Sequence, residues 1–508
     1  MSQTRREFLV AGPALAVQVP PGNAIVVDPK PLFDFSPLFY MQFMEPLGVT
    51  DSSVEASWDY ERDDWRKDLV DATRELAPDV IRWGGIYSRY YRWREGLGPA
   101  RQRPRTYNYT WGGWETNRVG THEFVDFCRR AGAEPLYCVN FSGDGVERYR
   151  KDSRWGDARE AADWVSYSND PGNAERKRNG SPDPLNIKLW QLGNETSYGK
   201  EGFPRDESIR QTIGFAKAMR ARDRSIQLIG WGDYGRGTSG RELWAGELLK
   251  QAGEHLDYVA IHMMGMSPRR KETLLRGNRY QKDPAAAWEE LLELSDIVEQ
   301  RVTELEQVLT AQRARQLIAI TEGHLSMVPH NANPILLEWL SAAYHARSMN
   351  IYHRHGAKVR ITTGADFAGN RWTVNAVMLQ TPRGISHLTP AGSVMRLYKR
   401  HNGKQGVAVR SSPPDLDIAA SRTGNRVFLH VLNKNLRRPV GAVFAVEGMR
   451  AAGGRVFEIA PEDARTAVGL DQPAVFEPRE RDLGAGPVIS WRFPAGSVSA
   501  VELDVQPA

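Results

Sequence analysis

Cysteine is scarce in this chain, and long apolar runs are missing. Only two cysteines, Cys128 and Cys138, occur among the 508 residues. Each lies in an apolar pattern and neither has a neighbour at metal-ligand spacing, so we predict two buried free thiols rather than a disulfide or a zinc site. No segment after residue 20 approaches the roughly 18 uninterrupted apolar residues that a membrane-spanning helix requires. The sequence therefore argues against a disulfide-stapled scaffold, and we expect no membrane anchor.

Charge of one sign is concentrated in only two short stretches of the chain. The formal net charge is only +5 over 508 residues, and the arginines are scattered. Two local basic stretches, Arg176–Arg178 and Pro268–Arg279, are more typical of solvated loops than of a polyanion site. We therefore expect no nucleic-acid partner. The chain is long enough for a large barrel and a second domain.

The first twenty residues are predicted to be a targeting segment and not part of the fold. Arg5–Arg6 is followed by Phe8–Leu9 and a mild apolar run that ends in Ala14–Ala16. This pattern is similar to a bacterial twin-arginine export signal with a small-residue cleavage site. It predicts an exported protein, periplasmic or secreted. The alternative is a plain disordered start.

Short apolar runs of strand character recur eight times, and helical patterns follow most of them. Near-continuous apolar character, rather than alternation, is typical of parallel strands that are covered on both faces. In chain order the runs are Phe39–Phe43, Val80–Trp83, Pro135–Asn140, Ile187–Leu192, Ile226–Trp231, Tyr258–His262, Leu317–Thr321 and Val359–Thr363.

The intervals between these runs predict helices. They include Asp63–Leu76, Asp206–Arg222 and a long helix over Pro284–Arg315. Thr121–Ala131 begins with a threonine cap and ends at Gly132. Eight strand–helix units predict an α/β fold, a (β/α)8 TIM barrel over residues 35–390. A doubly wound open sheet is the alternative, disfavoured because no glycine-rich phosphate turn follows the first strand.

The pattern changes after about residue 400, where strands follow one another without helices. This predicts a C-terminal antiparallel β-sandwich domain of residues 391–508. Residues 21–34 are assigned to the same domain, because Ala24–Val27 could add a strand to it. The predicted strands are Leu416–Ser421, Arg426–Leu432, Ala442–Val446, Arg455–Ile459 and Val488–Phe493.

Two glutamates come directly after strand-like runs, Glu195 in LWQLGNETSY and Glu322 in ITEGH. A carboxylate at the carboxyl end of a barrel strand points into the mouth that all eight strands share. Retaining glycosidases need two carboxyl groups about 5–5.5 Å apart, one protonated and one ionised. Either glutamate alone is more often an ion-pair partner or a neighbour of a helix cap. The pair together predicts catalysis by Glu195 and Glu322.

The other strand ends are rich in hydroxyl-binding groups and aromatic faces, which a sugar requires. Arg82 would favour the ionised form of a nearby carboxylate, and His262 could orient or reprotonate the acid. Asn194 can bind the sugar hydroxyl beside the reacting carbon. We expect no cofactor and no metal. The predicted substrate-binding residues are Glu45, Arg82, Trp83, Asn140, Asn194, Trp231, His262 and His324.

These residues lie in motifs that resemble retaining α-L-arabinofuranosidases of glycoside hydrolase family 51, in clan A. The resemblance implies that Glu195 is the acid/base with Asn194 beside it, that Glu322 is the nucleophile and that Glu45 binds substrate. It also implies a homo-oligomer, often a hexamer. The similar segments are QFMEPLG (Gln42–Gly48), IRWGG (Ile81–Gly85), YRWREGLGP (Tyr91–Pro99), Leu189–Glu195, Ala260–His262, Thr321–Glu322, LYKRHNG (Leu397–Gly403) and Leu416–Asn433.

The chain departs from the family at three places around the expected pocket. Ile86 stands where an asparagine usually touches the sugar, and Met263–Met264 stand where a tyrosine is usual. Gly323–His324 follow the expected nucleophile instead of Trp–Asn. These changes leave the cleavage machinery but alter its surroundings.

We therefore expect an exo-acting retaining glycosidase that acts on an oligo- or polysaccharide, with a terminal α-L-arabinofuranoside as the best single substrate. A galactofuranoside, a β-xyloside or a uronide is the alternative within the enzyme class. A barrel that binds glycans without cleaving them is the alternative from another class.

Overall fold

The structure is a computed structural model. It describes residues 23–146, 155–198, 202–237, 240–265, 270–380, 384–486 and 488–507, together with the backbone of two short strands, β1 (Leu9–Val10) and β2 (Val17–Gln18). The export signal expected over residues 1–20 lies otherwise outside the described residues.

Eight parallel strands form the barrel, and their spatial order is their order in the chain. The first and last strands meet at a parallel bridge between Tyr40 and Thr362, where the Thr362 amide donates to the Phe39 carbonyl at 2.8 Å. This closure confirms the predicted TIM barrel. The strands are β4 (Met41–Met44), β7 (Val80–Trp83), β10 (Glu134–Val139), β11 (Leu189–Leu192), β12 (Gln227–Trp231), β15 (Tyr258–Met264), β16 (Leu317–His324) and β17 (Val359–Thr362).

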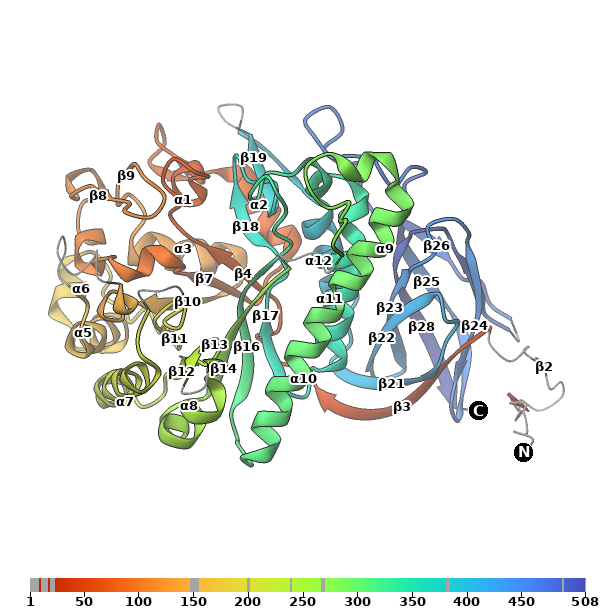
Figure 1. The fold of residues 1–508 in the computed structure, drawn as a ribbon, viewed down its shortest axis with the longest axis horizontal. Helices are drawn as coiled ribbons and strands as arrows, with labels where there is room; N and C mark the ends of the chain where they lie inside the picture. The colour runs from red at the N-terminus through yellow and green to blue at the C-terminus, as the bar shows by residue number, and fades with distance from the viewer. Residues whose placement is uncertain are drawn as a thin grey trace.

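Helices follow the barrel strands and cover them (Figure 1). None of the described helices is long and apolar enough to cross a membrane. The longer helices are α2 (Lys67–Leu76), α3 (Thr121–Ala131), α5 (Ala158–Asn169), α7 (Arg205–Arg222), α8 (Ala245–Ala252), α9 (Pro284–Leu294), α10 (Asp296–Ala311), α11 (Ala342–Arg354) and α12 (Pro390–Arg400).

Two helix predictions need correction. Gly120, not Thr121, is the N-cap of α3, and the Thr121 hydroxyl instead accepts a hydrogen bond from the Trp164 indole at 3.1 Å. The long helix predicted over residues 284–315 is broken at Ser295 into α9 and α10. The Leu292 carbonyl, which would accept from residue 296 in a continuous helix, accepts instead from the Arg347 guanidinium of α11. The Ser295 hydroxyl donates to the same carbonyl at 2.6 Å, so a local contact and a contact with another helix both satisfy it where the chain breaks.

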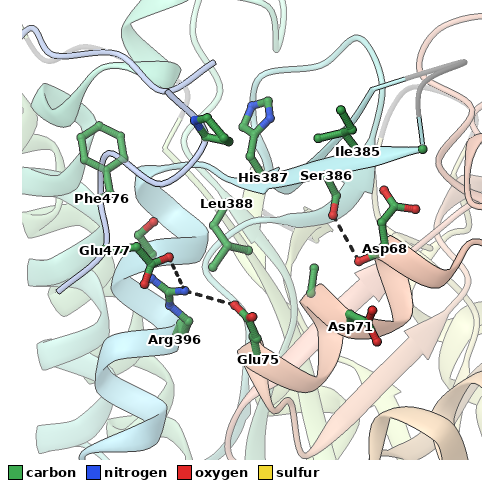
Figure 2. Close-up of a pocket in the computed structure, with 14 residues that line it drawn as sticks. Asp68, Asp71, Glu75, Ile385, Ser386, His387, Leu388, Arg396, Phe476 and Glu477 are labelled. Carbon is green, nitrogen blue, oxygen red and sulfur yellow. Dashed lines mark hydrogen bonds and ion pairs between the residues drawn. The ribbon is translucent and has the colours of Figure 1, made fainter. Parts of the chain in front are cut away.

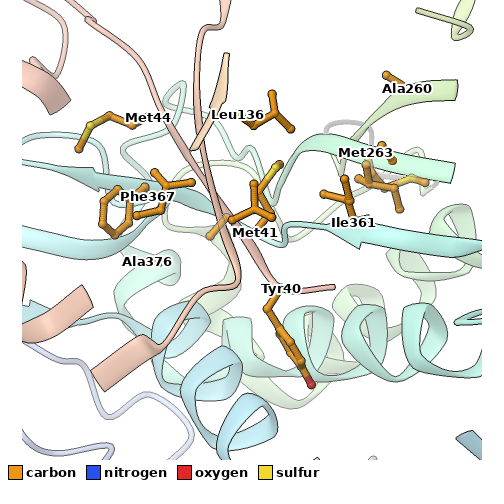
Figure 3. Packing of buried hydrophobic residues seen from close by; sticks show 14 of the residues in the cluster. Tyr40, Met41, Met44, Leu136, Ala260, Met263, Ile361, Phe367 and Ala376 are labelled. Carbon is orange, nitrogen blue, oxygen red and sulfur yellow. The ribbon is translucent and has the colours of Figure 1, made fainter. Parts of the chain in front are cut away.

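One continuous hydrophobic core fills the barrel and the layer between its strands and helices. Figure 3 shows part of it, where Met41, Leu136 and Ile361 come from three different strands and are fully buried. Cys128 and Cys138 are buried free thiols, as predicted. Such a rigid core gives the residues at the strand ends fixed positions.

The C-terminal domain is one nine-stranded sheet with its own core (Figure 1). The N-terminal strand β3 (Ala24–Asp34) joins it. β3 pairs antiparallel with β21 but parallel with β24, so the sheet is not wholly antiparallel. This is possible because β3 comes from the far end of the chain and no hairpin fixes its direction. The other strands are β21 (Gln405–Ser411), β22 (Leu416–Thr423), β23 (Arg426–Asn433), β24 (Val440–Val446), β25 (Met449–Ile459), β26 (Arg479–Asp482), β27 (Ser490–Phe493) and β28 (Val498–Pro507).

The barrel and the C-terminal domain meet along a hollow of about 380 Å³ between α2, α12, strand β20 (Ile385–Leu388) and residues 473–477 (Figure 2). The buried guanidinium of Arg396 pairs there with Glu75 at 3.2 Å and with Glu477 at 2.8 Å. Since one arginine holds a carboxylate from each side, this hollow is part of the junction between the two domains.

A cluster of buried rings forms another part of the junction. His353 of α11 lies 3.4 Å from His430 of β23 between their Nδ1 atoms, and its Nε2 is 2.6 Å from the Tyr40 hydroxyl. The Tyr398 ring stacks on His430 at 4.1 Å. Burial lowers the pKa of His430 to about 3, and burial and the nearby His430 lower the pKa of His353 well below its usual value. Both imidazoles are therefore neutral in the folded protein near pH 7.

This burial predicts a loss of stability in acid. Unfolded His430 binds a proton near pH 6.5, whereas the folded residue stays neutral until about pH 3. The unfolded state is therefore favoured progressively as the pH falls from 6.5 towards 3, by up to ~1.4 kcal/mol per pH unit for one histidine. The free energy of unfolding, measured in urea, should fall between pH 7 and pH 5 by about 2 kcal/mol less in His430→Gln than in the wild type. His255→Gln, outside the cluster, should keep the wild-type drop; equal drops in all three proteins would contradict the prediction.

Candidate active site

The side chain of Arg82 lies at the centre of the barrel mouth and is fully buried. Its Nε donates to Gln191 Oε1 at 2.8 Å, its Nη1 to Glu322 Oε1 at 2.9 Å and its Nη2 to Asn194 Oδ1 at 2.6 Å. These partners lie on β11, on β16 and in the loop after β11. One guanidinium therefore joins three walls of the barrel and fixes the positions of Asn194 and Glu322.

The two predicted catalytic glutamates face one another across this centre. His262 Nδ1 lies 3.0 Å from Glu195 Oε1 and 3.5 Å from Glu322 Oε2. One oxygen of each carboxyl group lies within 4.8 Å of the other. Retaining glycosidases hold their carboxyl groups about 5–5.5 Å apart, whereas inverting enzymes separate them by roughly 6.5–9.5 Å to admit a water. The spacing here fits direct attack by one carboxylate.

The backbone at Glu195 has a left-handed conformation with φ of 54°, which is uncommon for a residue other than glycine. The neighbouring loop holds it there. Asp144 Oδ2 accepts from the Asn194 amide at 3.2 Å and from Arg89 Nε at 3.1 Å. Arg89 Nη2 donates to the Asn194 carbonyl at 3.3 Å and lies 3.8 Å from Glu195 Oε2. Arg89 and Asp144, which the sequence analysis missed, thus position Glu195.

The two carboxyl groups differ in their electrostatic surroundings. Burial raises the pKa of both above the usual range for a glutamate. Glu322 has a direct hydrogen bond from the Arg82 guanidinium at 2.9 Å, whereas the Arg89 guanidinium lies 3.8 Å from Glu195 and the imidazole of His262 lies nearer, at 3.0 Å. The ionised form is therefore better stabilised at Glu322 and the protonated form at Glu195. This difference is the one that an acid and a nucleophile need.

His262 contributes no positive charge at neutral pH, because burial lowers its pKa to about 4. A neutral imidazole carries a single N–H. Its Nε2 lies 3.1 Å from the Thr321 hydroxyl, and its backbone amide donates to Asp233 Oδ2 at 3.0 Å. These contacts fix the ring so that Nδ1 can exchange a hydrogen bond with Glu195.

Glu45 lies beside the pair, at the end of β4. Its Oε1 accepts from the Tyr87 amide at 3.0 Å and from the Trp111 indole at 3.2 Å. Burial and then the charge of Glu322 raise the pKa of Glu45 well above the usual range. A protonated Glu45 can donate a hydrogen bond to a sugar hydroxyl. Trp111, which packs edge-on against Trp372, adds an aromatic face that the sequence analysis missed.

His324 and Asp366 form a second charged pair at the ends of β16 and β18 (Asp366–Gly369). His324 Nδ1 lies 2.9 Å from Asp366 Oδ1. Burial opposes protonation, but the nearby Asp366 carboxylate outweighs it and the pKa of His324 is raised above its usual value. The mouth therefore holds a histidine that is protonated more readily than a free imidazole.

Most of the predicted site residues meet in this mouth. Glu195, Glu322, Arg82, Asn194 and His262 are in contact, Glu45 and His324 lie around them, and the Trp231 ring packs edge-on against His262 at 4.5 Å. The Asn194 Nδ2 atom has no protein partner among the described residues and is free to bind a hydroxyl.

Two predicted substrate-binding residues do not reach this group. Trp83 follows Arg82 on β7, so its side chain points to the opposite face, where it packs against Phe124 of α3. The side-chain amide of Asn140 joins two loops, donating to the Tyr91 carbonyl of the segment after β7 at 3.3 Å and accepting from the Gly143 amide of its own loop at 3.1 Å. Strand alternation excludes the Trp83 side chain from the mouth. Hydrogen bonds to two loops occupy the Asn140 side chain.

Glu195, His262 and Glu322 also form a set that could hold a metal ion, since one ligand atom of each lies within 4.8 Å of the others. The Arg82 guanidinium, however, already occupies Glu322 Oε1 and places a fixed positive charge beside the set. A divalent cation would be repelled by that charge. The donor set therefore fits acid–base chemistry better than metal binding.

Comparisons with known proteins agree with this geometry. Residues 72–282 match the family model of the alpha-L-arabinofuranosidase 1 domain. The chain is 31% identical over 235 residues to an intracellular exo-α-(1→5)-L-arabinofuranosidase of Acetivibrio thermocellus, an alignment that covers 44% of each chain. It is 33% identical over 234 residues to α-L-arabinofuranosidase C of Emericella nidulans, covering 44% of this chain and 43% of that protein. The alignments thus span less than half of the relatives' own length.

Solved structures show the same fold over nearly the whole chain. The arabinofuranosidase of Thermotoga maritima, in complex with arabinose, has a TM-score of 0.77 at 23% identity and covers 95% of this chain and 100% of that one. A family 51 α-L-arabinofuranosidase of Bifidobacterium longum has a TM-score of 0.80 at 20% identity, with coverage of 96% and 100%. The sequence matches show that part of the chain is similar to α-L-arabinofuranosidases, and the solved structures show that nearly the whole chain shares its fold with family 51 arabinofuranosidases.

Proposed function

We propose that this protein is an exo-acting retaining glycoside hydrolase that releases terminal α-L-arabinofuranose from a glycan. The observation that carries the proposal is the pair Glu195 and Glu322, close enough for direct attack and held in different electrostatic surroundings. The names of the matched relatives support the choice of sugar. A barrel that only binds glycans has no need for two carboxyl groups arranged in this way.

The geometry supports a double displacement. Glu322, ionised beside Arg82, attacks the anomeric carbon while Glu195 gives its proton to the leaving glycosidic oxygen. The aglycone departs as an alcohol, and the sugar is left as an ester of Glu322. Glu195, now ionised, takes a proton from a water that attacks the same carbon and releases Glu322. The net stereochemistry is retained because the carbon is inverted twice.

A neutral sugar fits the mouth better than a uronide. The basic groups of the mouth are already paired, Arg82 with Glu322, Arg89 with Asp144 and His324 with Asp366. A sugar carboxylate would add a further negative charge without an unpaired cation to receive it. Galactofuranosides and β-xylosides remain the alternatives, because Ile86, Met264 and Gly323 alter the family pocket.

Removing the proposed nucleophile should abolish turnover but allow chemical rescue. Glu322→Ala should lower kcat on an aryl α-L-arabinofuranoside by roughly 10³-fold or more. Azide, which can enter the vacated space, should restore the reaction and give a glycosyl azide of inverted configuration. Glu290→Gln, at a buried carboxylate of α9 outside the mouth, should keep wild-type turnover. Turnover by Glu322→Ala within about tenfold of the wild type, without azide, would reject the assignment.

Removing the proposed acid should depend on the leaving group. Glu195→Ala should slow alkyl-linked arabinofuranosides by roughly 10²–10⁴-fold, the usual effect of a positioned acid. An activated phenol leaves without that proton, so its release should remain fast while the second step becomes limiting. Stopped-flow measurements should show a burst of phenol followed by slow turnover. Equal slowing of both substrate types with no burst would show that Glu195 has another role.

The Glu45 carboxyl group can be displaced without changing Glu45 itself, by adding a side chain at Gly85, which lies against it. A Cβ atom at Gly85 would lie 2.0 Å from Glu45 Oε2, so Gly85→Ala must move that carboxyl group. Gly98 is a matched control, with φ of 74° against 71° at Gly85 and nothing within 4 Å of its Cβ position. Backbone strain should destabilise both variants, and Gly85→Ala the more, because the Gly85 ψ of −159° lies in a region that is almost restricted to glycine. Only Gly85→Ala should lose turnover, by ~10-fold or more; similar turnover in the two variants would argue against a substrate-binding role for Glu45.

A further inference from the structure

Two arginines face one another on a hairpin beside the proposed acid. The hairpin consists of β13 (Tyr234–Gly237) and β14 (Gly240–Leu243), which follow β12 at the mouth of the barrel. Arg236 lies directly opposite Arg241 in the antiparallel register, and both are exposed. Residues paired in this way have their Cβ atoms roughly 4.5–5.5 Å apart, and like charges there destabilise the pair.

No acidic side chain in the described ranges neutralises either arginine. Glu242, next to Arg241, points to the other face of the hairpin and pairs there with Arg205. On the arginine face, the Arg241 guanidinium lies 5.0 Å from the centre of the Tyr234 ring. The Tyr234 hydroxyl donates to Glu304 at 2.8 Å, so that carboxylate is engaged elsewhere. The hairpin register thus places two guanidinium groups opposite each other, and their N–H donors have no acidic partner among the described residues.

These arginines line a hollow of about 330 Å³ between the hairpin and the segment that follows the proposed acid. Its other lining residues are Ser197, Tyr198, Tyr234 and Gly235. Ser197 and Tyr198 follow Glu195 by two and three positions, so the hollow lies beside the group that protonates the leaving oxygen. Whatever is linked to that oxygen must extend past Glu195, and this places the aglycone on the side of the hollow.

The wall of the hollow is held in place by side-chain hydrogen bonds. The Trp231 indole donates to Ser197 Oγ at 2.8 Å, and Ser197 Oγ donates to the Tyr234 carbonyl at 2.7 Å. The Tyr198 hydroxyl donates to Asp233 at 2.7 Å, and Asp233 also pairs with Arg301. The Asp233 carboxylate behind this wall is therefore already paired, and the charged residues that line the hollow are the two arginines. A preformed wall of this kind lowers the cost of ordering a bound ligand.

We propose that this hollow is an aglycone subsite for an acidic sugar, whose carboxylate pairs with Arg236 and Arg241. The proposal rests on the proposed function, which makes Glu195 the acid. Guanidinium groups bind carboxylates through two parallel hydrogen bonds, which makes paired arginines selective for a uronate over a neutral ring. The enzyme would then remove a neutral terminal sugar from a uronate-bearing chain.

The test compares two arabinofuranosides that differ only in the aglycone, one linked to a galacturonate disaccharide and one to a galactose disaccharide. Wild-type kcat/KM should be ~10-fold or more higher on the acidic substrate, mainly through KM, and the ratio should fall as salt is raised. Arg236→Gln/Arg241→Gln should bring the ratio close to one. Arg479→Gln/Arg481→Gln, a matched pair of exposed arginines on β26, should keep the wild-type ratio. A wild-type ratio near one, or an unchanged ratio in the hairpin variant, would overturn the proposal.

Two further measurements separate this proposal from the proposed function. Failure of the wild type to cleave an aryl α-L-arabinofuranoside would contradict the proposed identity of the terminal sugar but would leave the proposed subsite standing. Calorimetric titration with digalacturonate and with digalactose then measures binding at the subsite directly. Only digalacturonate should bind, and the hairpin variant should lose that affinity. Binding of both disaccharides, or of neither, would reject the subsite. The single variants, checked by thermal unfolding, serve if the double variant does not fold.

Discussion

The buried guanidinium of Arg82 is the interaction on which the mouth of this barrel depends. It donates to Gln191, Asn194 and Glu322 while excluded from water, and the Phe43 ring lies 5.0 Å from its charge. A buried charge is tolerated only when its partners surround it in good geometry. The partners are therefore as constrained as the arginine itself, and the two walls that carry them cannot shift independently. This arrangement holds Glu322 ready before any substrate arrives.

Much of the fold could be predicted because barrel strands are buried on both faces. Seven of the eight predicted runs overlap the observed strand by four residues or more, and the first, at Phe39–Phe43, overlaps β4 at Met41–Phe43. The break between α9 and α10 was missed, because the contact of Arg347 with Leu292 exists only in the folded protein and Ser295, whose hydroxyl reaches the same carbonyl, is a weak signal by itself. Local propensity is overridden by tertiary contacts in such places.

The site was predictable to the extent that it lies at strand ends. Strand alternation also assigns opposite faces to Arg82 and Trp83, so a stricter use of the pattern excludes Trp83 from the mouth. Arg89, Asp144 and Trp111 were missed because they come from irregular turns, η1 (Ile86–Arg89), η4 (Ser142–Gly145) and the loop before β9 (Trp114–Glu115). Irregular segments have no periodicity from which to predict where a side chain points. The opposed surroundings of Glu195 and Glu322 depend on distances of 2.9 and 3.8 Å, which no sequence pattern specifies.

Different structural elements carry the acidic and the basic groups around the mouth. Acidic groups follow the ends of the barrel strands themselves, at Glu45, Glu195 and Glu322, and their position is set by the rigid core. Arg236 and Arg241, which pair with no acidic side chain in the part of the chain that the structure describes, stand on a hairpin that the barrel does not need for closure. Loops of this kind can change without loss of the fold, whereas the strand ends cannot. The chemistry at the centre and the recognition of what is attached to the sugar are thus carried by parts of the chain that can vary separately.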